Sequence, residues 1–366
     1  MRLESFFRVM KPNGSMQAAV YQGHRVVAVE TIPVPPIGPG EILVRVHSCG
    51  ICHTDLKKIE YDLLPPPRIY GHETAGEVVA TGPGVSSFAP GDRVVAFHHI
   101  PCRSCFYCSR KLYAQCETYK RVGITAGFEP AGGGFAQYVR VMDWIVRDGV
   151  QKIPGGVSYD TACFVEPVNT CLKGVVQLEP RPDDTILIQG QGSIGLMFTM
   201  LMRRYGCTIV STDTIGTRLD LSRRFGAAHA LDPRQSDIAA YCRELTSGRG
   251  ADIVISATSA PGLVQEAVRA SRPGARILLF SQTSDQERIE LPGKDICMGE
   301  RVLFGSYSAS VDLQEESARL VFSGELPVEE MVSHRVPLSE VRRGIDLALR
   351  PDAKSLKIIV QPQRWS

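Results

Sequence analysis

Four cysteines lie close together in the pattern C-x2-C-x2-C-x7-C, at Cys102, Cys105, Cys108 and Cys116. Thiolates this near in sequence can surround one ion without closing a long chain loop, and tetrahedral sulfur coordination suits Zn²⁺. A closed four-ligand shell leaves no position for substrate, so the pattern predicts a structural metal and a catalytic site elsewhere. Chance clustering of reduced thiols and disulfides are alternatives. An iron–sulfur cluster is a third, but the bacterial ferredoxin run has a shorter last spacing and a proline where this chain has Glu117.

The composition narrows the class of protein. A chain of 366 residues is long enough for two domains with separate cores. The net charge of +2 gives no attraction to nucleic acid, and no apolar run reaches membrane-spanning length. The N-terminus lacks the apolar segment and cleavage site of a secretory signal. We therefore expect a cytoplasmic protein with reduced thiols, a flexible extension over residues 1–15, and ordered structure from Met16.

The first zone, from Met16 to about Pro154, consists of β-branched runs separated by Gly and Pro. Such punctuation predicts short strands in a small barrel-like β domain. The expected strands are Val26–Ile32, Glu41–Val46, Gly76–Thr81, Arg93–Phe97 and Ala136–Val141.

The second zone, from about Thr185 to Phe304, alternates short apolar runs with amphipathic stretches. This alternation predicts an α/β fold with a doubly wound parallel sheet covered on both faces. The expected strands are Thr185–Gln189, Thr208–Thr212, Asp252–Ser256 and Arg276–Phe280, and the expected helices include Leu196–Tyr205 and Arg218–Phe225. The tail, Asp312–Gln361, reads as two helices and a final strand, Leu356–Val360.

A glycine-rich turn follows the first strand of the second zone. Gly190 would make the tight turn, Gly192 would let the backbone approach a pyrophosphate, and Gly195 would let the helix pack against the strand. Ser193 and Ile194 complete the motif GQGSIG. Asp213, at the end of the next strand, can bind a ribose 2′-hydroxyl and would repel a 2′-phosphate, which favours NAD over NADP. A methyltransferase turn is the alternative, and Arg218 is either a cofactor contact or merely solvated.

Three further stretches carry metal-ligand side chains. CGICHTD at 49–55 follows a strand, GHE at 71–73 follows a proline-rich loop, and FVEP at 164–167 precedes the second zone. A catalytic zinc needs about three protein ligands and an open position, which Cys, His and Glu can supply. Taken singly, each stretch is equally compatible with core packing or an ordinary loop. Their combination with a dinucleotide motif indicates a catalytic metal.

These motifs resemble the zinc-dependent medium-chain dehydrogenases of the alcohol, polyol and threonine dehydrogenase type, over essentially the whole chain from Met16. The resemblance rests on GICHTD, GHETAGEV, GDRV, the four cysteines, VEPV, GQGSIG and Asp213. It implies a GroES-like β-barrel catalytic domain over 16–165, which contains the structural-zinc lobe. It also implies a Rossmann domain over 166–305 and a C-terminal segment, 306–366, that completes the catalytic domain.

The resemblance also implies ligands for a catalytic zinc. Cys52 and His72 match the first two ligands of the family. Glu166 stands where alcohol dehydrogenases proper have a second cysteine, and in the polyol and threonine branch Glu73 is an alternative direct ligand. Which carboxylate binds in the resting state stays open. Cys163 and Cys171 flank Glu166 and are alternative ligands.

Other roles come from the same resemblance. Asp55 matches a carboxylate that orients the ligating imidazole, Thr54 the hydroxyl that accepts the substrate proton, and Thr170 a residue near the nicotinamide. Many members place a histidine three residues after Thr54 to pass the proton to solvent, and this chain has Lys57 instead. His53 is either a pyrophosphate contact or a half-exposed histidine.

The implied function is hydride transfer between NAD(H) and a secondary alcohol or polyol, with two Zn²⁺ per chain and a homodimeric or homotetrameric assembly. Replacing a thiolate by a carboxylate hardens the metal, which suits substrates with neighbouring hydroxyls. A metal-free quinone or enoyl reductase of the same fold and a non-catalytic NAD-binding protein are the competing hypotheses. We expect substrate contacts from Tyr61–Pro67, Thr125–Pro130 and Gly299–Ser308, and no nucleic-acid or membrane partner.

Overall fold

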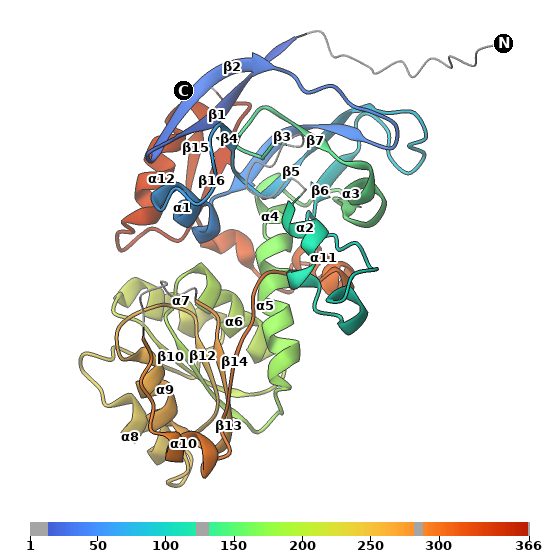
Figure 1. Cartoon of the computed structure of the whole chain (residues 1–366). Helices are drawn as coiled ribbons and strands as arrows, with labels where there is room; N and C mark the ends of the chain where they lie inside the picture. The colour runs from blue at the N-terminus through green and yellow to red at the C-terminus, as the bar shows by residue number, and fades with distance from the viewer. Residues whose placement is uncertain (1–13, 122–131, 282–287, 365–366) are drawn as a thin grey trace, which may run out of the picture. The chain divides into compact units, whose positions relative to one another are not determined.

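The computed structural model describes residues 14–121, 132–281 and 288–364 (Figure 1). The first thirteen residues of the expected N-terminal extension and the expected substrate loop Thr125–Pro130 lie outside this part of the chain. The chain divides into two compact units, Met1–Glu166 with Ser310–Ser366 and Pro167–Ala309. The first unit is therefore built from both ends of the sequence.

The first unit contains two β-sheets, which are predominantly antiparallel. The smaller sheet has the strand order β2-β1-β4, with β1 (Ser15–Gly23), β2 (Val26–Pro33) and β4 (Arg68–Ile69). The larger sheet has the order β15-β16-β3-β5-β6-β8, and β7 also pairs with β3. Its strands are β3 (Ile42–Gly50), β5 (Glu73–Thr81), β6 (Arg93–Ala96), β7 (Tyr138–Val141), β8 (Val150–Lys152), β15 (Val332–Pro337) and β16 (Lys357–Gln361).

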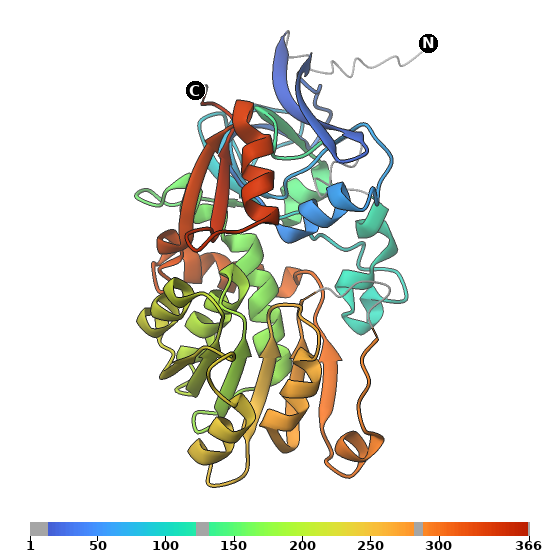
Figure 2. The same cartoon turned by 90° about the vertical axis from the view of Figure 1, so that its left-hand side faces the viewer.

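Short helices connect these strands. They are α1 (His53–Glu60), α2 (Glu117–Arg121), α3 (Asp143–Asp148), α4 (Tyr159–Ala162), α11 (Gln314–Phe322) and α12 (Val341–Leu349), with 3₁₀ turns at Cys108–Arg110, Tyr113–Gln115, Val311–Leu313, Val328–Met331 and Leu338–Glu340. Helix α12 lies beside β15 and β16 (Figure 2). Helix α5 (Val165–Leu178) begins in the first unit and continues into the second.

The second unit is a six-stranded sheet of order β11-β10-β9-β12-β13-β14, in which every pair is parallel. The chain reads β9 (Thr185–Gln189), α6 (Ser193–Arg203), β10 (Thr208–Thr212), α7 (Gly216–Phe225), β11 (His229–Leu231), α8 (Ile238–Leu245), β12 (Ala251–Ser256), α9 (Leu263–Ala270), β13 (Ser271–Leu279), α10 (Gly293–Cys297) and β14 (Val302–Gly305). All five residues of β9 are buried, as expected for a central strand covered on both faces.

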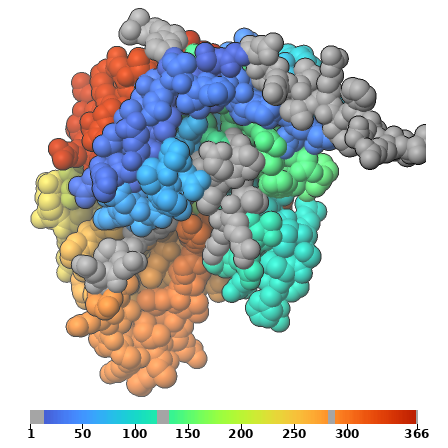
Figure 3. Space-filling model, turned by 45° about the horizontal axis from the view of Figure 1, so that its top comes forward, coloured from blue at the N-terminus to red at the C-terminus, as the bar shows by residue number. Residues whose placement is uncertain are grey.

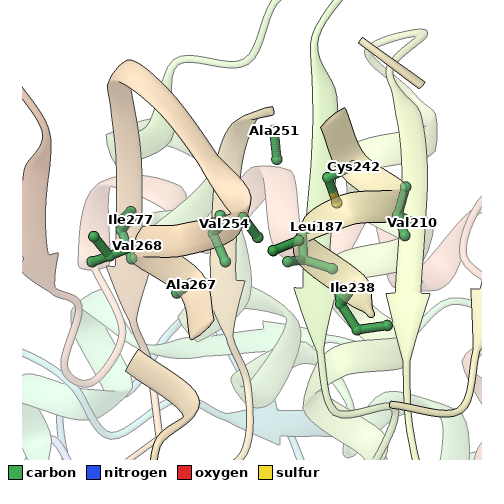
Figure 4. Close-up of a cluster of buried hydrophobic side chains, with 11 residues drawn as sticks. Leu187, Val210, Ile238, Cys242, Ala251, Val254, Ala267, Val268 and Ile277 are labelled. Carbon is green, nitrogen blue, oxygen red and sulfur yellow. The ribbon is translucent and has the colours of Figure 1, made fainter. Parts of the chain in front are cut away.

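Part of the core of the second unit lies between its sheet and helices α8 and α9 (Figure 4). Leu187 of β9 packs there with Val254 of β12, Ile277 of β13 and Val268 of α9, and each of these side chains is at least 97% buried. The expected α/β class and parallel sheet are therefore confirmed. None of the helices in the described ranges combines the length and the hydrophobicity that a membrane crossing requires.

Several expected elements agree with the structure, and the differences have local causes. Strands β9 and β10 have the expected bounds, whereas β3 and β5 extend further toward the metal-ligand motifs. Helix α1 follows β3 directly, within the first zone, where the sequence predicted only strands and turns. Glu166 and Pro167 lie in the first turn of α5 rather than in a loop, because proline lacks only a backbone donor that the first helical turn leaves unpaired anyway.

Candidate active site and metal centres

The four cysteines lie in a lobe that follows β6 and includes the start of α2, defined here as residues 102–119. The sulfur of Cys108 lies 3.9 Å from that of Cys102 and 3.5 Å from that of Cys105, and all four sulfurs lie within 4.8 Å of one another. A tetrahedron with Zn–S bonds of about 2.3 Å has edges of about 3.8 Å. The sulfurs therefore fit one zinc ion.

The lobe has almost no hydrophobic core besides its cysteines. Cys108 and Cys116 are buried and pack with Tyr113 and Tyr119, whereas Phe106 is 63% exposed. The lobe stands out on the surface as the teal segment of Figure 3. Hydrogen bonds from the hydroxyl and backbone of Ser104 lower the pKa of Cys102 to about 5, which favours the thiolate that metal binding requires.

A second group of potential ligand atoms lies where the ends of two paired strands meet. Cys52 follows β3, and His72 and Glu73 stand at the start of β5. Strands β3 and β5 are antiparallel, with Gly50 opposite Glu73, so the two motifs meet at the same edge. One ligand atom each from Cys52, His72 and Glu73 lies within 4.8 Å of the others. His72 and Glu73 are buried, and Cys52 is half-buried.

Asp55 fixes the orientation of His72. Its Oδ1 lies 3.0 Å from Nδ1 of His72, which leaves Nε2 of the imidazole for a metal. Asp55 also belongs to the first turn of α1, for which Cys52 is the N-cap; the Cys52 sulfur accepts from the Thr54 amide at 3.5 Å. Burial opposes a charge on His72, yet Asp55 and Cys52 hold its pKa well above the ordinary value. The local field therefore favours a cation.

The Glu73 carboxylate is held in a confined space. Its Oε2 contacts the ammonium of Lys357, which comes from β16. A Cβ added at Gly50 would lie 1.9 Å from the same oxygen and 2.7 Å from Cε of Lys357. Only glycine at position 50 leaves room for this pair.

Glu166 approaches the same region from α5, but its nearest potential co-ligands are different. Its Oε1 lies 3.5 Å from Nε2 of His99. His98, His99 and Glu166 form a third group of ligand atoms within 4.8 Å, and all three residues are buried. Burial, reinforced by Glu73 and opposed by His72, raises the pKa of Glu166 to about 7. Glu166 is thus near Cys52, His72 and Glu73, but its ligand atoms group with those of His98 and His99 instead.

The remaining residues expected at the catalytic metal lie around α1 and α5. Thr54 is a half-buried residue in the first turn of α1, His53 beside it is exposed, and Lys57 is half-buried one turn later. Cys163 and Cys171 are fully buried. Within the described residues neither joins a group of potential metal ligands, so the structure offers no support for them as ligands.

The glycine motif forms the turn between β9 and α6. Gly190 has φ +87°, and a Cβ there would lie 2.7 Å from Thr258, while a Cβ on Gly195 would lie 1.8 Å from the Gly190 carbonyl oxygen. At Gly192, by contrast, a Cβ would meet nothing closer than an Arg218 nitrogen at 3.9 Å. Contacts within the protein therefore do not require a glycine at position 192. Close approach of a cofactor phosphate to the backbone would require one.

Asp213 follows β10 and is tied to the same turn. Its carboxylate accepts the Gln191 amide at 2.7 Å and the Ile215 amide at 2.9 Å. The Arg218 guanidinium lies 3.9 Å from it and on the side of Gly192. The turn, the carboxylate and the arginine thus line one end of the parallel sheet, the place where such sheets bind dinucleotides.

Some residues of these sites were missed in the sequence. Lys357 is far from Glu73 in the chain and carries no motif. His98 and His99 could have been noticed as adjacent imidazoles just before the first zinc cysteine. A pocket past the ends of β12 and β13, lined in part by Ser256, Thr258, Leu263 and Ser281, also had no recognisable signal.

Two family models match the chain. One is the alcohol dehydrogenase GroES-like domain, over residues 38–152, and the other is the zinc-binding dehydrogenase domain, over residues 193–323. They confirm the GroES-like and Rossmann assignments.

Individual relatives agree with these models. A sorbitol dehydrogenase of Bacillus subtilis is 29% identical over 96% of this chain and 98% of its own length. An L-threonine 3-dehydrogenase of Symbiobacterium thermophilum is 31% identical over 91% of this chain and 94% of its own. The structure of an alcohol dehydrogenase of Escherichia coli CFT073, complexed with NADH, matches with a TM-score of 0.85 and 26% identity, covering 95% of this chain and 100% of the other.

Both sets of zinc ligands and the dinucleotide turn are assembled in the structure. A metal-free reductase would need neither ligand set. The chain belongs to the zinc-containing medium-chain alcohol, polyol and threonine dehydrogenase family, with a structural four-cysteine site, a catalytic Cys/His/Glu site and an NAD(H)-binding domain.

Proposed function

We propose that this dehydrogenase oxidises secondary alcohols that carry a neighbouring hydroxyl or amine, and that it uses NAD rather than NADP. The observation that carries the proposal is the ligand group Cys52, His72 and Glu73, with a further carboxylate, Glu166, close by. One thiolate and a choice of carboxylates make a harder centre than two thiolates would. A hard centre favours substrates that offer two oxygen or nitrogen atoms.

The residues around this centre have distinct proposed roles. Bound zinc supplies a Lewis acid that favours loss of the alcohol proton. Cys52 and His72 would hold the metal, and Asp55 would keep His72 in its ligating tautomer. Thr54 would accept the hydrogen bond of the substrate hydroxyl and relay the proton by passing its own to water. Glu73 and Glu166 are alternative oxygen ligands, and Lys357 partly neutralises Glu73.

The names of the relatives support this substrate class. Sorbitol carries a hydroxyl beside each of its secondary alcohols, and threonine carries an amine beside its hydroxyl. Thr170 of α5 is proposed to pack near the nicotinamide. Substrate contacts are proposed from Tyr61–Pro67 in the first unit and from Gly299–Ser308 in the second, a stretch that includes β14. Lys57 stands where many relatives have a histidine, so we propose that the proton leaves through water.

The main test is a substrate panel with purified protein. Vicinal diols, polyols and amino alcohols should be turned over with a kcat/KM at least about 10-fold above that of simple alcohols of the same length, which corresponds to roughly 1.4 kcal/mol at the transition state. Cys52→Ser should abolish turnover, and Cys297→Ser, at an exposed cysteine outside every ligand group, should not. A preference for simple long-chain alcohols would refute the proposal.

The cofactor preference has a separate test. The Asp213 carboxylate repels a 2′-phosphate, and Asp213→Asn removes the charge while keeping an oxygen for one of the two backbone amides, Gln191 and Ile215, that now donate to the carboxylate. We expect this variant to raise the ratio of kcat/KM with NADP to that with NAD by about 10-fold or more. An unchanged ratio would show that Asp213 does not select the cofactor.

We also propose a homodimer or homotetramer located in the cytoplasm. Reducing conditions keep the four zinc thiols available, which supports the location. Sedimentation velocity on the full chain would distinguish monomer, dimer and tetramer, and fluorescent-fusion imaging would test the location.

A further inference from the structure

A second group of metal-ligand atoms lies beside the Cys52 group and shares no residue with it. It consists of one atom each from His98, His99 and Glu166, all within 4.8 Å of one another. The exposed fractions of these residues are 1%, 6% and 7%. Such a concentration of buried polar groups needs a physical reason, because each loses its hydration on folding.

The local backbone brings the two imidazoles together. The chain turns just after β6, where the Phe97 amide donates to the Gly149 carbonyl and the Ile100 amide donates to the His98 carbonyl, both at 2.8 Å. The ring centroids of His98 and His99 are therefore only 3.8 Å apart. In a regular strand, successive side chains would point to opposite faces. The turn thus gathers both rings against the first turn of α5, where Glu166 stands.

Packing and ion pairing explain only part of this arrangement. Glu166 lies 3.5 Å from His99, and Phe97 and Tyr119 pack against the His99 ring at centroid distances of 5.1 and 5.2 Å. The His98 ring also packs, against His72 and Tyr119 at centroid distances of 5.3 and 6.3 Å, but both of its ring nitrogens are buried without a hydrogen-bond partner of ordinary geometry. An unsatisfied buried polar group costs roughly 1–3 kcal/mol. A ligand that accepts a nitrogen lone pair would remove that cost.

We propose that His98, His99 and Glu166 bind a divalent cation of the Zn²⁺ class, in addition to the ion at Cys52, His72 and Glu73. Two imidazoles and one carboxylate form the protein ligand set of several catalytic zinc sites, and they leave a position open for water. With Glu166 in this site, Glu73 is the oxygen ligand of the Cys52 group, and the four-cysteine group is unchanged. The proposal goes beyond the proposed function, since it does not depend on which alcohol is oxidised.

The two neighbouring cations are sterically compatible. The rings of His72 and His98 meet edge to face with centroids 5.3 Å apart, so their outer nitrogens need not point at one position. Paired metals in enzymes lie about 3.5–4 Å apart. Glu166 has two carboxylate oxygens, and its Oε1 already lies 3.5 Å from Nε2 of His99.

The first experiment counts zinc. The full chain would be equilibrated in metal buffers that set the free Zn²⁺ concentration, from about nanomolar to about micromolar. Bound zinc would then be measured by elemental analysis. The three ligand groups found among the residues that the structure describes predict three ions per chain. His98→Gln and His99→Gln, which keep much of the side-chain volume, should each bind one ion fewer. His334→Gln, a matched change at a half-exposed histidine on β15, should bind the same number as the parent.

A double variant shows whether the two neighbouring groups hold separate ions. Cys52→Ser and His99→Gln should each lose one ion, and the combined variant should lose both. If the combined variant loses no more than either single variant, the two groups share one ion and the proposal is wrong. Two ions per chain in the parent protein, with no fall in His98→Gln or His99→Gln, would also overturn it.

Cobalt(II) gives a spectroscopic readout that a merely structural role for the histidines would not change. Co²⁺ bound by the four cysteines or by Cys52 shows thiolate-to-metal charge transfer, whereas a site of two imidazoles and a carboxylate has no thiolate. We expect one equivalent of Co²⁺ to add visible d–d absorption without charge transfer in the parent protein and not in His99→Gln. Identical titrations of the two proteins would refute the site.

Discussion

At the scale of single residues, Gly50 controls the catalytic ligand group although it binds nothing. Its missing side chain leaves the space in which the Glu73 carboxylate meets Lys357. A methyl group there would overlap both. The backbone of Gly50 also pairs with Ile359 of β16 and Glu73 of β5, so it cannot easily move away.

We therefore expect Gly50→Ala to displace Glu73 and to weaken zinc binding at the Cys52 group, with kcat/KM falling by at least about 10-fold. Steady-state kinetics and zinc analysis would measure these effects. The matched control is Gly155→Ala in the same unit, where an added Cβ meets nothing within 4 Å. Normal activity in Gly50→Ala would show that the Glu73 position is not required.

Tyr21 and Asp62 give a pH-dependent stability that does not involve a metal. The Tyr21 hydroxyl donates to Oδ1 of Asp62. That hydrogen bond lowers the pKa of Asp62 below 3.8, while burial, together with Asp62, raises the pKa of Tyr21 from 10.0 to about 12. The lowered carboxyl pKa stabilises the fold above pH 3.8, and the raised phenol pKa stabilises it below pH 10.

Tyr21→Phe keeps the ring and removes the hydroxyl. Its melting temperature should lie below that of the parent protein across neutral pH, and the gap should narrow as the pH falls through the lowered pKa of Asp62. It should narrow again as the pH rises through about 12. Thermal melting of both proteins in parallel, between pH 3 and 8, would test the acid side, because zinc loss in acid affects both. A gap that stays constant down to pH 3 would contradict the assignment.

Residues with a local motif could be predicted, and residues defined by long-range contacts could not. The four zinc cysteines were recognisable because their type and spacing are constrained by metal chemistry. Cys52, His72 and Asp55 were identified because they match motifs of the family that the chain resembles. Lys357 and His98 act through contacts with segments distant in the chain. Only the strand pairing and the turn after β6 bring those side chains into place.

At the scale of elements, the four-cysteine lobe contrasts with the sheets around it. Its buried side chains are chiefly its own cysteines and two tyrosines, and it contains only short turns and α2. A segment with so little apolar burial needs another source of stability, and a structural zinc ion contributes folding free energy directly.

Replacing Cys105 by Ser should therefore lower the melting temperature by roughly 5 °C or more and remove one zinc ion. Cys297→Ser is the control, at an exposed cysteine of α10 outside every ligand group. NADH binding by the second unit, followed by nucleotide fluorescence, should persist at low temperature. An unchanged melting temperature would mean that the lobe does not need its metal.

Helices and strands could be predicted from the sequence where neighbouring residues alone determine their structure. Strand β9 has the expected bounds, because a buried apolar run specifies it without distant partners. Helix α6 follows the glycine turn as expected but begins at Ser193, inside the motif, rather than at Leu196. The short strands β11, β14 and β15 were not expected. Each has three to six residues, and their pairing with β10, β13 and β16 supplies most of the order that their own sequences lack.

At the scale of the whole molecule, the two units have separate cores, and a core substitution should affect them separately. Leu187 is fully buried on β9. Leu187→Ala should destabilise the second unit by about 2–5 kcal/mol and weaken NADH binding, while the zinc content stays the same. Calorimetry, NADH titration and elemental analysis would measure this. Loss of zinc in this variant would show that the units do not fold independently.

The route of the chain through the first unit has a consequence for biosynthesis. Strand β16, near the end of the chain, pairs with Cys49 and Gly50 of β3 and carries the lysine that reaches Glu73. A ribosome makes β3 long before β16, so part of the edge of β3 stays unpaired in the nascent chain during the interval. Every residue of the Rossmann unit is synthesised in the interval. Translation therefore allows the cofactor unit to close before the catalytic unit, although the catalytic unit begins first.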